Sequence, residues 1–146
     1  MLPDSIELII VTPEKQLLRE SVVEVVMPGA EGELGILPGH APLMTELGIG
    51  ELHYRGAGAS ATGVLAIIRG FAEVLGDRVT ILAETAERAA EIDLARAEAA
   101  RARAEKRLAS GDPNIDMDRV SIALQRALIR IQVARRYHRG APVETH

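Results

Sequence analysis

The sequence predicts a segregated α+β fold, with an N-terminal all-β sandwich followed by a C-terminal antiparallel α-helical hairpin. Residues 1–85 consist of short β-branched runs separated by glycine and proline turns, the pattern of a sandwich or barrel. Residues 86–146 are rich in Ala, Arg and Glu, which favour helix. A Ser-Gly-Asp-Pro-Asn break at residues 110–114 divides this helical half in two. We therefore expect two domains that meet near residue 85.

Six runs of Val, Ile and Leu in the first half are expected to form strands, because each ends at a turn residue. They cover residues 6–12, 21–27, 50–54, 63–68, 71–75 and 78–83. The turns between them are expected near Gly48, from Gly56 to Gly63, at Gly70 and at Gly76-Asp77. No helical period interrupts these runs, so the sequence argues against alternating strand–helix–strand units.

Two helices are expected in the second half. Asp93 suits a helix N-cap or a first-turn carboxylate, and the apolar stripe that follows it comprises Ala97, Ala100, Ala104 and Leu108. A second helix is expected to start near Asp116, with a stripe of Val120, Leu124, Ala127, Ile131 and Ala134. The short connection predicts an antiparallel hairpin. We expect the tail from about residue 138 to be disordered.

The alanine-rich seam predicts that the hairpin docks weakly. Burying one CH₂ group is worth about 0.8 kcal/mol, and alanine offers little such area. Docking of the hairpin on another surface is therefore expected to contribute only a few kcal/mol. An arm held so weakly can exist in two positions, although a permanently packed hairpin fits the same pattern.

Composition and motifs exclude several kinds of site. The chain has no cysteine, which excludes disulfides and thiolate metal sites and fits a reducing compartment. No metal site is expected, because metal-ligand spacing is absent from the histidines, which are His40, His53, His138 and His146. Neither a Gly-x-x-x-x-Gly-Lys-Ser/Thr loop nor a Gly-x-Ser-x-Gly elbow occurs. No run reaches the roughly 18 apolar residues of a membrane span, and no nucleic-acid partner is expected.

One segment of the β-rich half is unusual for a connection. Residues 31–44 hold three glycines, two prolines, two glutamates and a histidine between apolar residues. Because Gly permits positive φ and Pro fixes φ, the segment is expected to be tightly shaped backbone, although composition alone also allows a decorated turn. Glu31 and Glu33 form a close carboxylate pair. Without a partner base or a cleft signature, we expect no catalytic residue here.

The two halves differ in charge, which indicates different partners. Residues 1–85 carry 12 acidic and 5 basic side chains, whereas residues 86–146 carry 9 acidic and 12 basic ones. No acidic residue occurs between Asp118 and Glu144, a stretch that contains Arg119, Arg126, Arg130, Arg135, Arg136 and Arg139. The end of the chain is therefore a basic segment.

Four arginines of the predicted hairpin form a candidate polyphosphate site. They are Arg96 and Arg103, seven residues apart on the first helix, and Arg126 and Arg130, four apart on the second. In an antiparallel hairpin these guanidinium groups can converge on phosphate oxygens. Asp93 and Glu87 could accept hydrogen bonds from the amino group of a base. Spacing alone also fits a solvated arginine-rich surface, and leaves both interpretations open.

The order of these features resembles one family. Strands come first, then the Glu-Gly-Glu-Leu-Gly-Ile-Leu-Pro-Gly-His-Ala-Pro-Leu motif at residues 31–43, then Val-Thr-Ile-Leu-Ala at residues 79–83 and an Ala/Arg helical hairpin. This arrangement is similar to that of the ε subunit of bacterial F-type ATP synthase. The resemblance covers about residues 5–138, nearly the whole chain. The chain departs from the family at Arg69-Gly70-Phe71, where the family usually has a double glycine before the aromatic residue.

The resemblance implies a non-catalytic central-stalk rotor subunit of a complex that makes ATP from ADP and phosphate. In the family, the β-sandwich binds the γ subunit and sits on the c-ring, at the cytoplasmic face of the bacterial cell membrane. The loop of residues 31–43 lies at that base. Carried over by position, the c-ring and γ contact residues would be Glu31, Gly32, Glu33, His40 and Pro42. A stiff Gly/Pro loop suits the transmission of torque.

The resemblance also implies a regulatory hairpin. In the family, the extended hairpin inhibits ATP hydrolysis, and its basic residues meet an acidic segment of the β subunit. Some members bind ATP in the folded form through a motif matched here by Ile92, Asp93, Arg96 and Ala97, with further contacts at Glu87, Arg103, Arg126 and Arg130. ATP would be a regulatory ligand, and no obligatory cofactor is expected. The rival interpretation is a free-standing nucleotide-sensing module that uses the same arginines without a rotary partner.

Overall fold

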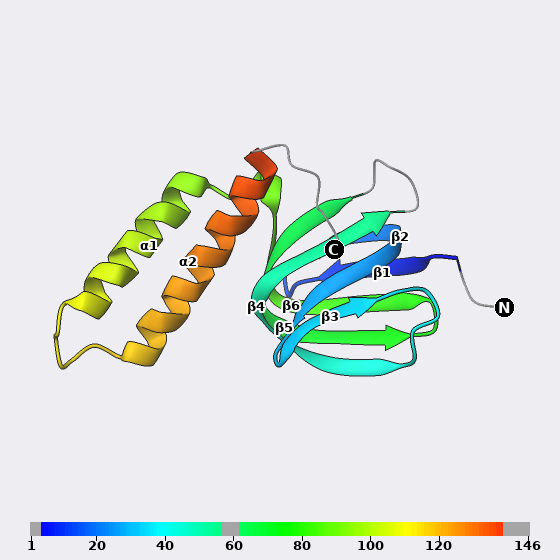
Figure 1. Ribbon diagram of the computed structural model, residues 1–146, viewed down its shortest axis with the longest axis horizontal. Helices are drawn as coiled ribbons and strands as arrows, with labels where there is room; N and C mark the ends of the chain where they lie inside the picture. Colours follow the sequence, from blue (N-terminus) through cyan, green and yellow to red (C-terminus); the bar gives the residue numbers. More distant parts are fainter. Residues whose placement is uncertain (1–3, 57–61, 139–146) are drawn as a thin grey trace. The chain divides into compact units, whose positions relative to one another are not determined.

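The computed structural model describes residues 4–56 and 62–138 of the chain. Within these ranges, the continuous chain up to Arg88 forms one compact unit, and the chain from Ala89 onward forms a second. The first, here called the strand unit, contains β1 (Ile6–Val11), β2 (Gln16–Gly29), β3 (Gly32–Ile36), β4 (Leu43–Gly56), β5 (Gly63–Leu75) and β6 (Arg78–Arg88). The second, the helical unit, contains a 3₁₀ turn η1 (Ala89–Glu91), α1 (Leu94–Ala109) and α2 (Met117–His138) (Figure 1).

The strands form a sheet that closes on itself. Their order is β1-β6-β5-β4-β2-β3, and β1 also pairs with β2. The β1–β6 pair is parallel, whereas the other pairs are antiparallel. Figure 1 shows the strands arranged in two facing layers. The predicted fold class, a β-sandwich followed by a helical hairpin, is confirmed.

Aliphatic side chains from every strand fill the interior of the strand unit. Leu8, Ile10, Leu52 and Ile81 are completely buried, and each alternates along its strand with a more exposed neighbour. Tyr54 lies in the same core cluster. Burial, and secondarily the Glu20 carboxylate, raise the pKa of Tyr54 above its ordinary value, against a smaller opposite effect of Arg88.

The prediction of two strands separated by a turn at Gly70 was wrong, because β5 runs without interruption through that residue. The ladder to β6 pairs Ile68 with Thr85 and Gly70 with Ala83, so the chain is only distorted between these pairs. Arg69 there has a φ of 58°, and Gly70 a φ of 140°. The two residues form an irregularity within a long strand. Gly48 lies inside β4 in the same way, and not in the predicted turn.

Residues 86–88 also differ from the prediction, which assigned them to the helical half. They continue β6, where Ala86, Glu87 and Arg88 pair with residues 67, 66 and 65 of β5. The Arg88 guanidinium donates to the carbonyl oxygen of Leu17 at 2.5 Å. Pairing with a buried neighbouring strand outweighs the helix propensity of these residues, because tertiary contacts override intrinsic propensity.

Part of the loop at residues 31–44 is also a strand. Residues 32–36 form β3, and they pair with residues 25–29 of β2 in an antiparallel hairpin. Ile36 is buried in the core, whereas the side chains of Glu31 and Glu33 are exposed. The tightly shaped backbone predicted here is thus a hairpin followed by a short connection to β4.

Each helix of the hairpin begins just after an aspartate that caps it. Asp93 is the N-cap of α1, and its Oδ1 accepts from the Arg96 N–H at 3.1 Å. Asp116 accepts from the Arg119 N–H at 3.1 Å in the same way, which starts α2. Arg135 of α2 and Glu98 of α1 form an ion pair at 3.0 Å. The predicted stripe of α2 faces inward at Val120, Ala127, Ile131 and Ala134, all of which are buried.

Two predictions concern residues that the structure does not describe. The turn between Gly56 and Gly63 includes residues 57–61, and the tail expected from about residue 138 includes residues 139–146. Both lie outside the described residues and stay predictions.

Candidate functional site

The β2–β3 turn and the start of β4 border an open cavity of about 540 Å³ that is lined by three carboxylates, those of Glu31, Glu33 and Glu46. The Ala30 N–H donates to the Glu46 carbonyl oxygen at 2.9 Å, which ties the turn to β4. Gly32 has a φ of 139°, a conformation that other residues rarely adopt. All three glutamates are exposed, so this end of the strand unit presents negative charge.

The connection between β3 and β4 holds His40 and Pro42, the other two residues of the predicted contact surface. Both are exposed, and neither lines the carboxylate cavity. The His40 backbone N–H donates to the Leu37 carbonyl oxygen at 3.1 Å, and its Nδ1 lies 2.6 Å from the Ala41 carbonyl oxygen. Because a carbonyl can only accept, Nδ1 carries the proton. The His40 ring therefore helps to fix the shape of its own connection.

An apolar patch that was not expected from the sequence lies on the outer face of β4, β5 and β6. It consists of Met44, Phe71, Leu75 and Leu82, which are 69%, 56%, 60% and 52% exposed. Phe71 pairs directly with Leu82 across the ladder, and Met44 pairs with Glu73, between the two apolar residues of β5. Exposed apolar surface of this kind marks interaction sites. The sequence offered one signal for this patch, because Phe71 is the only phenylalanine in the chain.

The predicted ATP-binding residues fall in two different units. Glu87 lies on β6 of the strand unit, whereas the helical unit holds Ile92, Asp93, Arg96, Ala97, Arg103, Arg126 and Arg130. Ile92 and Ala97 are buried. The side chains of Arg96, Arg103 and Arg126 are exposed, and that of Arg130 is half-buried.

Asp93 already has a structural role, because its carboxylate caps α1. Only one of its oxygens accepts the Arg96 N–H, so the other can accept a further hydrogen bond. The residue is exposed. Its position therefore allows both capping and ligand contact.

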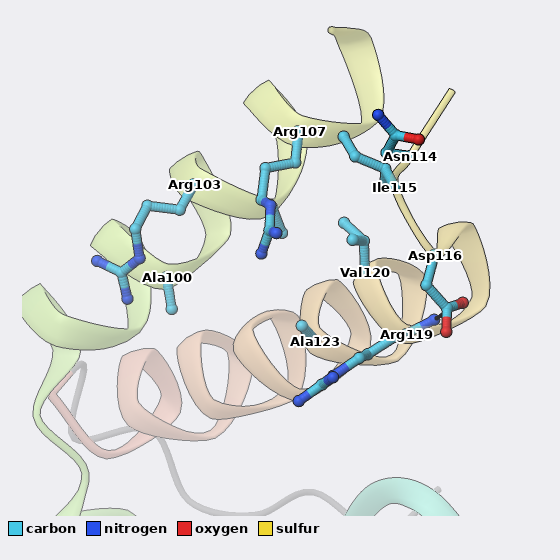
Figure 2. A pocket seen from close by; sticks show the side chains of 10 residues that line it. Ala100, Arg103, Arg107, Asn114, Ile115, Asp116, Arg119, Val120 and Ala123 are labelled. Atoms are coloured by element: carbon cyan, nitrogen blue, oxygen red, sulfur yellow. Dashed lines mark hydrogen bonds between the residues drawn. The ribbon is translucent and has the colours of Figure 1, made fainter. Parts of the chain in front are cut away.

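A groove of about 560 Å³ lies at the loop end of the hairpin (Figure 2). Arg103 and Arg107 of α1 and Arg119 of α2 line it, together with Val120 and Ala123. Figure 2 shows the side chains of Arg103 and Arg107 reaching from α1 towards α2. Of the predicted ATP-binding residues, Arg103 lines this groove, whereas Arg96, Arg126 and Arg130 are not part of its lining. The structure thus does not gather the whole predicted set around this groove.

Arg107 and Arg119 were missed as site residues. Arg107 follows Arg103 by four positions, so the two share a face of α1. Arg119 lies in the first turn of α2, next to the connection that brings the helices together. Helical spacing was a usable signal for Arg107, whereas the position of Arg119 depends on how the hairpin closes.

The described residues contain no group of three or more His, Asp or Glu side chains placed to hold a metal ion. Within the same ranges, no helix is long and apolar enough to cross a membrane.

Comparison with known sequences matches each of the two units to a described domain family. The family described as "ATP synthase, Delta/Epsilon chain, beta-sandwich domain" matches residues 5–89, and "ATP synthase, Delta/Epsilon chain, long alpha-helix domain" matches residues 90–135. A protein named ATP synthase epsilon chain from Syntrophobacter fumaroxidans is 52% identical over 131 residues, which cover 90% of this chain and 96% of that protein. The protein of the same name from Nitratidesulfovibrio vulgaris strain DP4 is 49% identical, with 88% and 95% covered.

Solved structures agree with the fold. A chain in the cryo-EM structure of Euglena gracilis mitochondrial ATP synthase, comprising OSCP, F1 and c-ring, matches with a TM-score of 0.79 and 26% identity. The match covers 92% of this chain and 83% of that one. A chain of the Tetrahymena thermophila mitochondrial ATP synthase has a TM-score of 0.57 at 15% identity, with 90% and 95% covered, and supports the fold alone. The order of the units, the motif of residues 31–43 and these similarities lead to one conclusion: this chain belongs to the ATP synthase delta/epsilon chain family, with the epsilon chains of bacteria among its relatives.

Proposed function

We propose that this chain is a non-catalytic rotor subunit in the central stalk of a proton-translocating F-type ATP synthase. The observation that carries the proposal is that the relatives named ATP synthase epsilon chain match across both units. The similarity to a chain of the Euglena structure, an assembly that includes F1 and the c-ring, supports a place in such an assembly. The chain would act as a peripheral protein at the cytoplasmic face of the bacterial membrane.

Two surfaces of the strand unit fit the proposed docking. The β2–β3 turn presents Glu31 and Glu33 beside the fixed backbone of Gly32, which suits a charged, shape-specific contact with the c-ring. His40 and Pro42 lie on the following connection and would face γ. The apolar patch of Met44, Phe71, Leu75 and Leu82 is a second surface, of the composition that buries well against a partner. We assign that patch to the γ subunit.

The hairpin would inhibit ATP hydrolysis in an extended position. Its second helix carries Arg119, Arg126, Arg130, Arg135 and Arg136, and an acidic segment of the β subunit is the complementary partner. Positive charge on one helix and negative charge on its partner favour association and orientation.

ATP would act on the hairpin by linkage. A ligand that binds only the folded hairpin stabilises it by RT ln(1 + [L]/Kd), about 2.7 kcal/mol at a hundredfold excess over Kd. That value is comparable with the few kcal/mol expected for docking of an alanine-rich hairpin. ATP abundance would therefore keep the hairpin folded, and ATP scarcity would release it to inhibit hydrolysis.

Titration of the isolated full chain with ATP tests the regulatory part, and we expect saturable binding. Arg126→Gln should weaken it about tenfold, the order of one charge-assisted contact. Asp93→Ser separates the two roles of Asp93, because serine is an equally good N-cap but lacks the carboxylate. Asp93→Ser should weaken ATP binding without loss of helix, whereas Asp93→Ala should also lose about 1 kcal/mol of stability.

Arg101→Gln is the matched control for these variants. Arg101 also lies on α1, where it pairs with Glu105 at 3.4 Å, and it is not among the predicted ligand residues. Calorimetry should show wild-type ATP affinity for this variant. Absence of saturable ATP binding to the wild-type chain, or unchanged affinity in Arg126→Gln, would remove the ATP-linked part of the proposal.

A further inference from the structure

The loop-end groove carries three positive charges that form no ion pair with any carboxylate of residues 4–56 and 62–138. It is lined by the guanidinium groups of Arg103, Arg107 and Arg119. Across residues 4–56 and 62–138, none of these three groups forms an ion pair or a side-chain hydrogen bond. Other arginines of the hairpin do find partners, as Arg101 does in Glu105 and Arg135 in Glu98.

One oxygen of the one carboxylate in the lining is engaged at the start of α2. Asp116 accepts the Arg119 backbone N–H at 3.1 Å and thereby caps α2. Figure 2 shows the Arg119 side chain running along α2 towards Ala123, so that its guanidinium group lies away from Asp116. The carboxylate therefore serves the helix start, and the guanidinium remains available for an anion.

The rest of the lining supplies few competing acceptors. Ala100, Ala104, Ile115, Val120 and Ala123 contribute apolar side chains. A groove with an apolar floor and several guanidinium groups favours an anion, because charge-assisted hydrogen bonds strengthen where water is partly displaced. The volume of about 560 Å³ accommodates a small anion with its remaining water shell.

The number of donors distinguishes between kinds of anion. Each guanidinium group offers a fork of two parallel N–H donors. A carboxylate has two oxygens, which one or two forks already occupy. A phosphate group has enough oxygens in a tetrahedral arrangement to engage forks from three sides. Three guanidinium groups in the lining of one groove therefore suit phosphate better than a carboxylate side chain.

We infer that the loop-end groove is a binding site for a phosphate oxyanion, with inorganic phosphate as its simplest ligand. The site is distinct from the proposed ATP site, with which it shares only Arg103. Arg107 and Arg119 belong to the groove alone. Because an anion contacting both would join α1 to α2, phosphate would stabilise the closed loop end of the hairpin.

The test is a titration of the full chain with inorganic phosphate at constant ionic strength. The ¹H–¹⁵N signals of the arginine Nε–H groups report on each side chain. We expect saturable shifts for Arg107 and Arg119. Arg107→Gln and Arg119→Gln should each weaken phosphate binding about tenfold. Far-UV circular dichroism checks that both exposed substitutions leave the helices intact.

Three comparisons make the result decisive. Lys106→Gln removes the same charge from the adjacent position, which does not line the groove, and should leave the phosphate affinity unchanged. Arg126→Gln should also leave the phosphate affinity unchanged, even if this variant no longer binds ATP. The phosphate site and the ATP site are therefore tested independently of each other. Acetate at equal ionic strength should give no saturable shift. Equal weakening by Lys106→Gln, or acetate binding as tight as phosphate binding, would overturn the inference.

Discussion

Replacing Gly70 with alanine is expected to lower the free energy of unfolding of the strand unit by about 3 kcal/mol or more. Gly70 has a φ of 140°, a region that other residues occupy only with strain. A Cβ there would also overlap the Leu82 carbonyl oxygen of β6 and lie 2.8 Å from the Ala83 Cα. Both obstacles are backbone atoms, so no side chain can move aside. The loss is a large share of the roughly 5–15 kcal/mol that stabilises a typical domain.

Gly32→Ala is the matched control for this prediction. Gly32 has nearly the same φ, 139°, but an added Cβ would meet nothing within 4 Å. The two variants therefore share the cost of the backbone conformation and differ in the overlap with β6. Urea unfolding followed by circular dichroism should show a clearly larger loss for Gly70→Ala. Equal losses for the two variants would show that β6 moves away without cost, contrary to our account of the irregularity in β5.

The double substitution Phe71→Ser, Leu82→Ser is expected to weaken association with a γ-containing complex about ten- to a hundredfold. Fully burying one large apolar side chain is worth about 1.5–3 kcal/mol. Because only about half of each side chain is exposed in the free chain, losing both on the partner surface costs about 1.5–3 kcal/mol in total. Phe71 and Leu82 are adjacent across the β5–β6 ladder and are 56% and 52% exposed. Because about half of each side chain is exposed, their replacement should leave the isolated chain folded.

Met117→Ser provides the matched control for the apolar patch. Met117 is 52% exposed, the same as Leu82, but it lies on α2. Surface-immobilised γ-containing complex would be titrated with each variant, and Met117→Ser should bind as the wild type does. Wild-type affinity in the double variant would show that the patch does not face γ.

The sequence predicted those features that depend on nearby residues. Asp93 and Asp116 cap the two helices as their positions indicated, because a cap acts over three residues. The stripe of α2 was predicted correctly for a similar reason, since helical periodicity is local. The fold class followed from the change of period between the two halves.

Features that depend on long-range pairing were not predictable in the same way. Gly70 looked like a turn, yet it lies within β5 because residues on both sides of it pair with β6. Residues 86–88 looked helical, yet the β5 ladder holds them as strand. The apolar patch depends on the register that places Phe71 beside Leu82, eleven positions later in the chain. The loop-end groove likewise requires the hairpin to close before Arg119 can lie near the arginines of α1.

The central claim is that the chain is a rotor subunit whose hairpin controls ATP hydrolysis. Its most direct test is the ATPase rate of a γ-containing F1 complex reconstituted with the full chain or with a chain that ends at Arg88, the last residue of β6. Both forms should bind the complex, because the apolar patch and the β2–β3 turn lie in the strand unit. At low ATP the full chain should inhibit hydrolysis and the shortened chain should not, and the difference should shrink as ATP rises. Equal hydrolysis rates with the two chains, both bound at stoichiometric levels, would contradict the account.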